Sequence, residues 1–182
     1  MHVNLHRCAW GGATVTGVAS VYSVVALYNA GQAAEYLAVR AVSIPAAPNA
    51  VFNFGIAQGP VGTMAGALQA IVTGEAPAPG AIYTSTTAVA PAFYFSAGTS
   101  NNQSQVWHHE FPLALLTPGS SLVVAAALVD VTLSAYFWAE AIKPEQLHPS
   151  ALLDEQAIEE GRIGDVSDTA IERFRSSGRR AP

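Results

Sequence analysis

Short apolar runs separated by glycine, proline, asparagine and serine make up most of the first 142 residues. In the clearest run, 50–57, the side chains of Phe52, Phe54 and Ile56 share one face. A period of two is the pattern of a β-strand, because successive side chains of a strand point to opposite sides. Gly55 inside this run predicts a bulge or a close approach of another backbone.

Nine or ten strands of this kind are expected. The turn at 29–32, in which Asn29 and Gly31 can adopt positive φ, predicts a hairpin between the first two strands. The alanine-rich segment 64–73 is compatible with a short helix or a strand. The other expected strands are 21–28, 36–44, 50–57, 81–86, 91–96, 105–111, 113–116, 121–128 and 131–140. Many short strands joined by turn residues are typical of an all-β sandwich or barrel.

Many of these strands are apolar on both faces, whereas a two-sheet sandwich needs apolar side chains only on its inner faces. Contact with another subunit would explain the second apolar face. The alternative is that small alanine and valine side chains are tolerated on an outer surface, since scattered exposed apolar residues are normal.

Charge is scarce in the same region and favours the first explanation. Residues 1–142 contain two arginines, no lysine and five carboxylates. A soluble monomer normally carries mixed charge over its surface, and the buried centres of subunit interfaces are depleted of charge. We therefore interpret residues 1–142 as a β-sandwich assembly domain.

The last 40 residues, 143–182, differ in composition, with six basic and eight acidic side chains. One Lys-Pro pair, at 143–144, and one His-Pro pair, at 148–149, predict an extended linker. Ser150 can cap a short helix that ends at Gly161. This charged linker and short helical or extended tail is either a docking peptide or a solvated, dispensable end. The candidate docking residues are Leu152, Leu153, Ile158, Ile171 and Phe174.

Several classes of protein are disfavoured. The net charge of −5, with no lysine or arginine cluster in residues 1–142, argues against nucleic-acid binding. The apolar run 121–139 approaches the length of a membrane span, but a carboxylate at its centre, Asp130, is costly in lipid, so no membrane segment is expected. Residues 1–7 are not followed by the apolar run of a secretory signal. A single cysteine, Cys8, allows no intrachain disulfide, which fits synthesis in a reducing compartment.

No catalytic pattern is present. A Gly-x-Ser-x-Gly elbow is absent, and the glycine-rich stretch 59–66 lacks the lysine of a phosphate loop. His108 and His109 would point to opposite faces of a strand, and the pair of His108 and Glu110 lacks a third metal ligand. We expect no catalytic residue, no metal and no cofactor.

Aromatic residues are the remaining candidates for a contact surface. Tyr136 and Trp138 share a face opposite Phe137, so one side of the final strand is expected to meet a sheet and the other a partner. Exposed aromatic rings could equally stack on sugars. The candidate subunit or shell contact residues are Phe52, Phe54, Tyr94, Trp107, His109, Tyr136 and Trp138.

Two pairs of stretches carry a resemblance to a known family: 23–32 with 37–42, and 107–113 with 116–124. They resemble strand and turn patterns of the capsid-decoration, cement and spike proteins of tailed bacteriophages, over about residues 20–140. The resemblance implies a jelly-roll antiparallel β-sandwich, commonly trimeric and without catalytic residues. The charged tail is not part of the pattern.

The resulting hypothesis is a homotrimeric virion protein, made in the host cytoplasm, that decorates or cements the capsid surface. Its expected partners are copies of itself and the major capsid protein or another virion protein. One alternative is a tail-fibre or spike domain that binds a carbohydrate receptor. The other is a β-sandwich or cupin-type enzyme, which the sparse carboxylates favour least.

Overall fold

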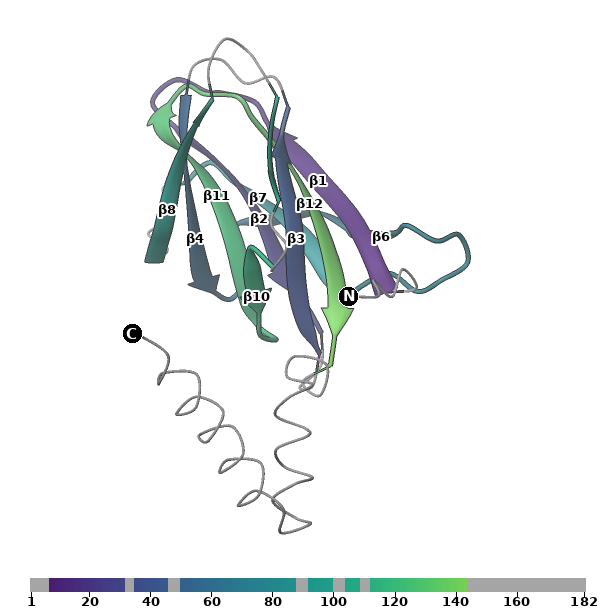
Figure 1. Cartoon of the computed structure of the whole chain (residues 1–182). Helices are drawn as coiled ribbons and strands as arrows, with labels where there is room; N and C mark the ends of the chain where they lie inside the picture. Colours follow the sequence, from purple (N-terminus) through teal and green to yellow (C-terminus); the bar gives the residue numbers. More distant parts are fainter. Residues whose placement is uncertain are drawn as a thin grey trace, which may run out of the picture. The chain divides into compact units, whose positions relative to one another are not determined.

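The computed structural model describes residues 7–31, 35–45, 50–87, 92–99, 104–108 and 112–143. These residues form twelve β-strands and no α-helix (Figure 1). Sheet A contains β1 (Cys8–Val15), β3 (Tyr36–Ile44), β6 (Gln69–Ala70), β9 (Gln105–His108), β10 (Ala114–Leu116) and β12 (Leu133–Ile142). Sheet B contains β2 (Tyr22–Asn29), β4 (Ala50–Gln58), β5 (Thr63–Ala67), β7 (Gly80–Ser85), β8 (Ala92–Thr99) and β11 (Ser120–Val129). The predicted all-β sandwich is confirmed.

The strands of the first half of the chain pair with those of the second half in reverse order. β1 pairs with β12, β2 with β11, β3 with β9 and β10, and β4 with β8, and every pair is antiparallel. The chain is therefore wound like one long folded hairpin whose successive strand pairs alternate between the two sheets. This nested order is that of a jelly roll.

The strands β5, β6 and β7 are additional to the strand pairs of this nested order. β7 extends sheet B beside β2, β5 pairs with β7, and β6 crosses to sheet A and pairs with β1. Leu68, between β5 and β6, is 2% exposed, and its N–H donates to the carbonyl of Gly80 at 3.0 Å. A Cβ at Gly80 would lie 2.4 Å from Leu68 Cδ1, so the glycine makes room for this side chain. The added segment thus fastens the two sheets together at one edge.

The core lies between the inner faces of the sheets, where side chains from alternating positions interdigitate. Sheet B contributes Phe52, Phe54 and Leu27, and sheet A contributes Phe137 and Leu37, all with at most 1% of their surface exposed. The register of β4 against β8 shifts between Phe54 and Gly55, which confirms the irregularity predicted at that glycine.

The predicted hairpin between the first two strands is wrong. β2 belongs to sheet B and β3 to sheet A, so the turn after Asn29 carries the chain across the sandwich. The Asn29 side chain accepts a hydrogen bond from Gly31 N–H at 2.9 Å and donates to the carbonyls of Glu35 and Leu116, both at 2.9 Å. These bonds tie the crossover to a strand of sheet A rather than folding it back along β2.

Two further differences concern the N-terminal region and the alanine-rich segment. The strand pattern does not predict β1, because Gly11 and Gly12 remove two side chains from its alternation, yet β1 pairs in sheet A with β12 on one side and with β6 on the other. The segment 64–73, compatible with a helix or a strand, contains β5 and β6.

The chain separates after Lys143 into two units, 1–143 and 144–182. The second unit, with the candidate docking residues Leu152, Leu153, Ile158, Ile171 and Phe174, lies outside the described residues. The apolar run 121–139 belongs to β11 and β12, strands of different sheets, with Asp130 at the turn between them. Within the part of the chain that the structure describes, no helix has the length and apolar character needed to cross a membrane.

Candidate contact surface

Three exposed aromatic side chains lie together on the outer face of sheet A. Trp10 of β1 is directly opposite Trp138 of β12, and Tyr136 is opposite Gly12. A Cβ at Gly12 would lie 2.5 Å from Tyr136 Cδ1, so the ring of Tyr136 covers the glycine backbone. Trp10, Tyr136 and Trp138 are 48%, 38% and 44% exposed, although each occupies a strand in the middle of its sheet.

The same face continues across β3 onto β9 and β10. Ala41 of β3 pairs with both Trp138 and His108, which places these side chains in one row. Val106 of β9 is exposed, and so is Leu115 of β10. We define the aromatic face as the outer surface of sheet A formed by Trp10, Val106, His108, Leu115, Tyr136 and Trp138.

An ion pair stands at one end of the aromatic face. Arg40 donates to Glu140 Oε2 through Nη2 at 2.8 Å and through Nε at 3.1 Å. The side chain of Glu140 is only 8% exposed, and the residue lies beside Trp138 in β12 and opposite Cys8 in β1. Burial raises the pKa of the Cys8 thiol, with a smaller contribution in the same direction from the Glu140 carboxylate. The thiol is therefore kept protonated and unreactive at neutral pH.

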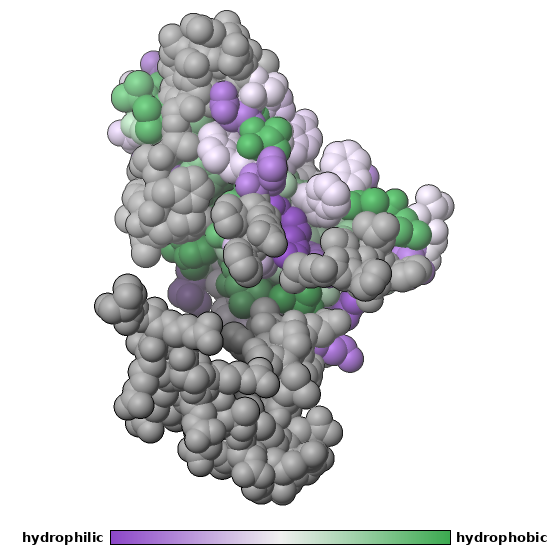
Figure 2. Space-filling view, in the orientation of Figure 1, coloured by the Kyte–Doolittle hydropathy of each residue, from purple (hydrophilic) through white to green (hydrophobic). Residues whose placement is uncertain are grey.

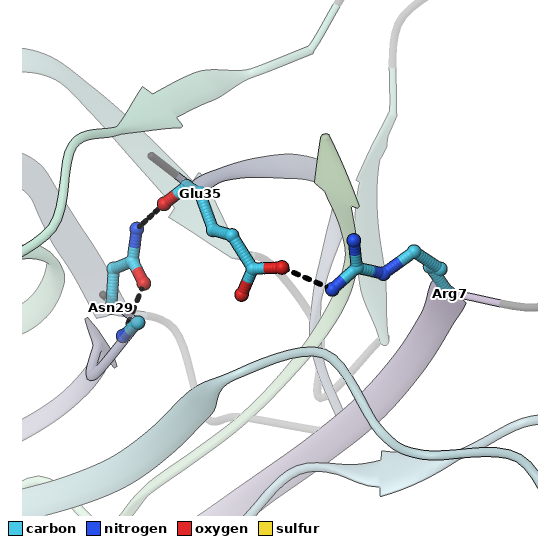
Figure 3. Close-up of polar contacts among 4 residues, drawn as sticks. Arg7, Asn29 and Glu35 are labelled. Atoms are coloured by element: carbon cyan, nitrogen blue, oxygen red, sulfur yellow. Dashed lines mark hydrogen bonds and ion pairs between the residues drawn. The ribbon is translucent and has the colours of Figure 1, made fainter. Parts of the chain in front are cut away.

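The second arginine of the domain is also paired. Arg7 donates to the Glu35 carboxylate, and the backbone carbonyl of Glu35 accepts from Asn29 (Figure 3). Both arginines among residues 7–143 are thus bound to carboxylates of the same chain. These ion pairs leave the surface with even less unpaired charge than the composition indicates. In the orientation of Figure 1, hydrophobic (green) and intermediate (pale) residues are interrupted by separate hydrophilic (purple) clusters (Figure 2).

The centre of the outer face of sheet B is different, because the chain itself covers it. Val24, Ala26 and Val123 alternate with core residues along β2 and β11, yet they have no exposed surface. Val61, from the connection between β4 and β5, and the ring of Tyr83 pack with them. The apolar outer face predicted from the strand patterns is therefore covered by the chain itself at the centre of sheet B, where Val51 and Met64 remain exposed towards the edges, whereas on sheet A aromatic side chains of β1 and β12 are exposed.

The structure separates the predicted contact residues into three groups. Tyr136 and Trp138 lie on the aromatic face, opposite the buried Phe137, as their alternation indicated. Phe52 and Phe54 are fully buried and belong to the core, so their assignment to an interface was wrong. The half-buried ring of Trp107 packs edge-on against Phe54 with centroids 5.1 Å apart, so it points inward as well.

The remaining two cannot be placed on a surface. Tyr94 belongs to β8, where only the backbone is described, and His109 lies outside the described residues. Trp10 was not among the predicted contact residues. Its alternation with Ala9 and Gly11 was the available signal, but without a predicted strand at 8–15 that alternation had no meaning.

Among the residues that the structure describes, no group of three or more histidine, cysteine, aspartate or glutamate side chains is placed to hold a metal ion. Comparisons with family models, with curated proteins and with solved structures found no match. The geometry of the chain is therefore the basis for the proposals that follow.

Proposed function

We propose that this jelly roll is a structural assembly subunit, of the kind that decorates or cements a virion shell, and that copies of it associate through the aromatic face. The observation that carries the proposal is the group of Trp10, Tyr136 and Trp138 on the middle strands of sheet A. Tryptophan and tyrosine are enriched at the energetic centres of protein interfaces. Here they occur in a domain whose arginines are already neutralised by its own carboxylates.

The size of the effect supports assembly over simple tolerance of surface residues. A tryptophan side chain buries up to about 250 Å². With 48% and 44% exposed, Trp10 and Trp138 leave roughly 230 Å² of ring surface to water. At about 25 cal/mol per Å² this corresponds to about 5–6 kcal/mol per copy, before the entropic cost of association. Small residues are tolerated at a surface, whereas two adjacent indoles of this exposure are a strong drive to associate.

One edge of sheet A favours association through its face. There β6 pairs with Ala9 and Trp10 of β1, so the chain itself occupies that part of the edge. A covered edge offers fewer free backbone groups for pairing with another copy. Side-chain packing on the aromatic face is then the route left for association on that side, and a trimer is the expected product by the family resemblance.

The test is the molar mass of the full chain in solution, measured by light scattering during size-exclusion chromatography. We expect a trimer for the wild type and a monomer for the double variant Trp10→Ser/Trp138→Ser. The matched control is Val51→Ser/Met64→Ser, which removes equally exposed apolar side chains from sheet B and should leave the trimer intact. A wild type that stays monomeric at millimolar concentration refutes the proposal.

The virion role needs a separate measurement. Antibodies raised against residues 7–143 should detect the protein in particles banded on a density gradient from cells that express it. The Trp10→Ser/Trp138→Ser variant should remain in the soluble fraction, while the sheet B control bands with the particles. Detection of the wild type only in the soluble fraction would leave an assembly protein without a virion role.

A further inference from the structure

A pocket with a volume of about 310 Å³ lies at the end of the sandwich where β1 ends and β5 begins. Its walls are Val15, Gly62, Thr63 and the run Thr84, Ser85, Thr86 and Thr87. None of these residues belongs to the aromatic face. Most of them come from the β5–β7 segment and the turn after it, so the addition to the jelly roll builds the pocket.

The position of each wall follows from strand alternation and pairing. Ile82 of β7 is a core residue, so Thr84, two positions on, lies on the same inner face of sheet B. Val15 is on the inner face of sheet A and is 8% exposed. Thr63 pairs with Thr84 in register. The pocket is thus the hydroxyl-lined end of the space between the two sheets, with one valine from the core.

Two local features hold the rim in place. Gly62 has φ +81°, and a Cβ there would lie 2.2 Å from the carbonyl oxygen of Thr84, so only glycine lets this backbone come so close to β7. Ser85 Oγ accepts a hydrogen bond from Thr87 N–H at 3.0 Å, which shapes the turn carrying Thr86 and Thr87. The hydroxyl groups therefore project from a fixed backbone.

The chemistry of the lining is uniform. Five of the seven described lining residues carry a hydroxyl group, and none of these seven is ionisable. A hydroxyl group both donates and accepts hydrogen bonds. An anion would find no cation here and a metal ion no carboxylate, whereas a neutral ligand with closely spaced hydroxyls of its own would satisfy the lining. The volume is at the lower end of the range of small-molecule sites.

We propose that this pocket binds a neutral carbohydrate residue. The hydroxyls of Thr63, Thr84 and Thr86 exchange hydrogen bonds with those of the sugar, and Val15 contacts a C–H face of the ring. The inference goes beyond assembly and does not depend on it, because each copy of the chain contains all the walls of the pocket. It would give a shell or spike protein a site for glycans on a cell surface.

Saturation-transfer NMR on the full-length protein tests the proposal with glucose, galactose, mannose, N-acetylglucosamine and their short oligomers as probes. We expect at least one of them to bind with a dissociation constant in about the millimolar range, equivalent to roughly 4 kcal/mol. Glucuronate, with the same ring and a carboxylate, should bind at least fivefold more weakly than glucose.

The variants locate the site. Thr84→Val keeps the shape of the side chain and removes its hydroxyl, and it should weaken sugar binding at least fivefold. Thr63→Val, at an exposed position of β5, should have the same direction of effect. The matched control is Thr14→Val, which removes a hydroxyl bonded to Ser134 on the outer face of sheet A and should leave binding unchanged.

Two results would overturn the inference. One is the absence of a signal from every neutral sugar. The other is binding that survives Thr84→Val and Thr63→Val but is lost in Trp10→Ser/Trp138→Ser, because the sugar would then stack on the aromatic face. Neither result changes the molar mass of the wild type, so the test of the pocket and the test of assembly remain independent.

Discussion

Replacing Asn29 with alanine tests how the jelly roll makes its first crossing between sheets. Asn29 is fully buried at the end of β2, and all of its amide contacts are with backbone. Its Nδ2 donates to the carbonyls of Glu35 and Leu116, and its Oδ1 accepts from Gly31 N–H. The substitution leaves three backbone groups without their partner, two in the β2–β3 connection and one at the end of β10.

The expected cost follows from how well water can replace each bond. The hydrogen bond to Leu116 is buried, so water cannot replace it in the variant, and the unsatisfied carbonyl of Leu116 lowers the free energy of unfolding by about 2 kcal/mol. The bonds to Glu35 and Gly31 are partly buried, and their loss costs about 1 kcal/mol each. The total of about 4 kcal/mol is a large part of the 5–15 kcal/mol typical of a domain. It should lower the midpoint of thermal unfolding by about 10 °C or more.

Urea and thermal unfolding followed by circular dichroism measure this loss. Wild type and variant must be compared at one protein concentration, because self-association adds to apparent stability. Asn29→Asp keeps the acceptor and removes both donors, so it should lose most of the same free energy. Gln58→Ala, at an exposed strand end, should change stability by less than about 0.5 kcal/mol. A loss below about 1 kcal/mol for Asn29→Ala would show that the crossover from β2 to β3 does not depend on this side chain.

Three other substitutions test the packing of sheet A and its edge. Leu68→Ala leaves a cavity between the sheets and should lower the free energy of unfolding in urea by about 2–5 kcal/mol. Proteolysis in the β5–β7 segment should become faster. Unchanged cleavage would contradict the role of Leu68 in fastening that segment to the two sheets. Arg40→Met leaves the Glu140 carboxylate buried without its partner and should lower the free energy of unfolding by about 3 kcal/mol or more. Adding Glu140→Gln should restore part of that loss, because no unpaired charge is then buried. A double variant no more stable than Arg40→Met would argue against a stabilising ion pair. Because burial raises the pKa of Cys8, the native chain keeps the thiol proton at pH values where the unfolded chain has lost it. This contribution is complete below about pH 8.5, the ordinary thiol pKa, and is lost as the pH rises through the folded value. The unfolding free energy of the wild type should therefore fall relative to Cys8→Ala above that pH, and parallel curves from pH 7 to 10 would be inconsistent with a buried thiol.

The positions of most strands could be predicted, because alternation and turn residues are local properties of the chain. The run 36–44 coincides with β3, and 50–57 differs from β4 by one residue. β1 was missed because two successive glycines remove the side chains on which the pattern depends. It is stabilised instead by neighbours on both sides, β12 and β6, and Tyr136 covers Gly12.

The contact surface was only partly predictable, for a different reason. Alternation divides a strand into two faces but does not say which one turns inward. For β12 the assignment of Phe137 to the core and Trp138 to the outside was right, whereas for β4 Phe52 and Phe54 proved to be core residues. Charge scarcity indicated an uncovered apolar face but did not say on which sheet, and only the tertiary structure packs Val61 against the centre of sheet B while leaving Trp10 and Trp138 of sheet A exposed.

The amino-acid order of this protein was sufficient for its strand-rich architecture, the scarcity of charged residues in 1–142 and the boundary region near residue 143, since each can be read from the chain without knowing which distant segments meet. Tertiary structure alone decided the nested pairing, in which Cys8 meets Glu140, and the meeting of Trp10 with Trp138. It also brought Val15 to Thr84 of β7 and to Thr86 and Thr87 in the turn that follows. Contacts between residues so far apart depend on how two whole sheets pack, and no local pattern in a chain records that.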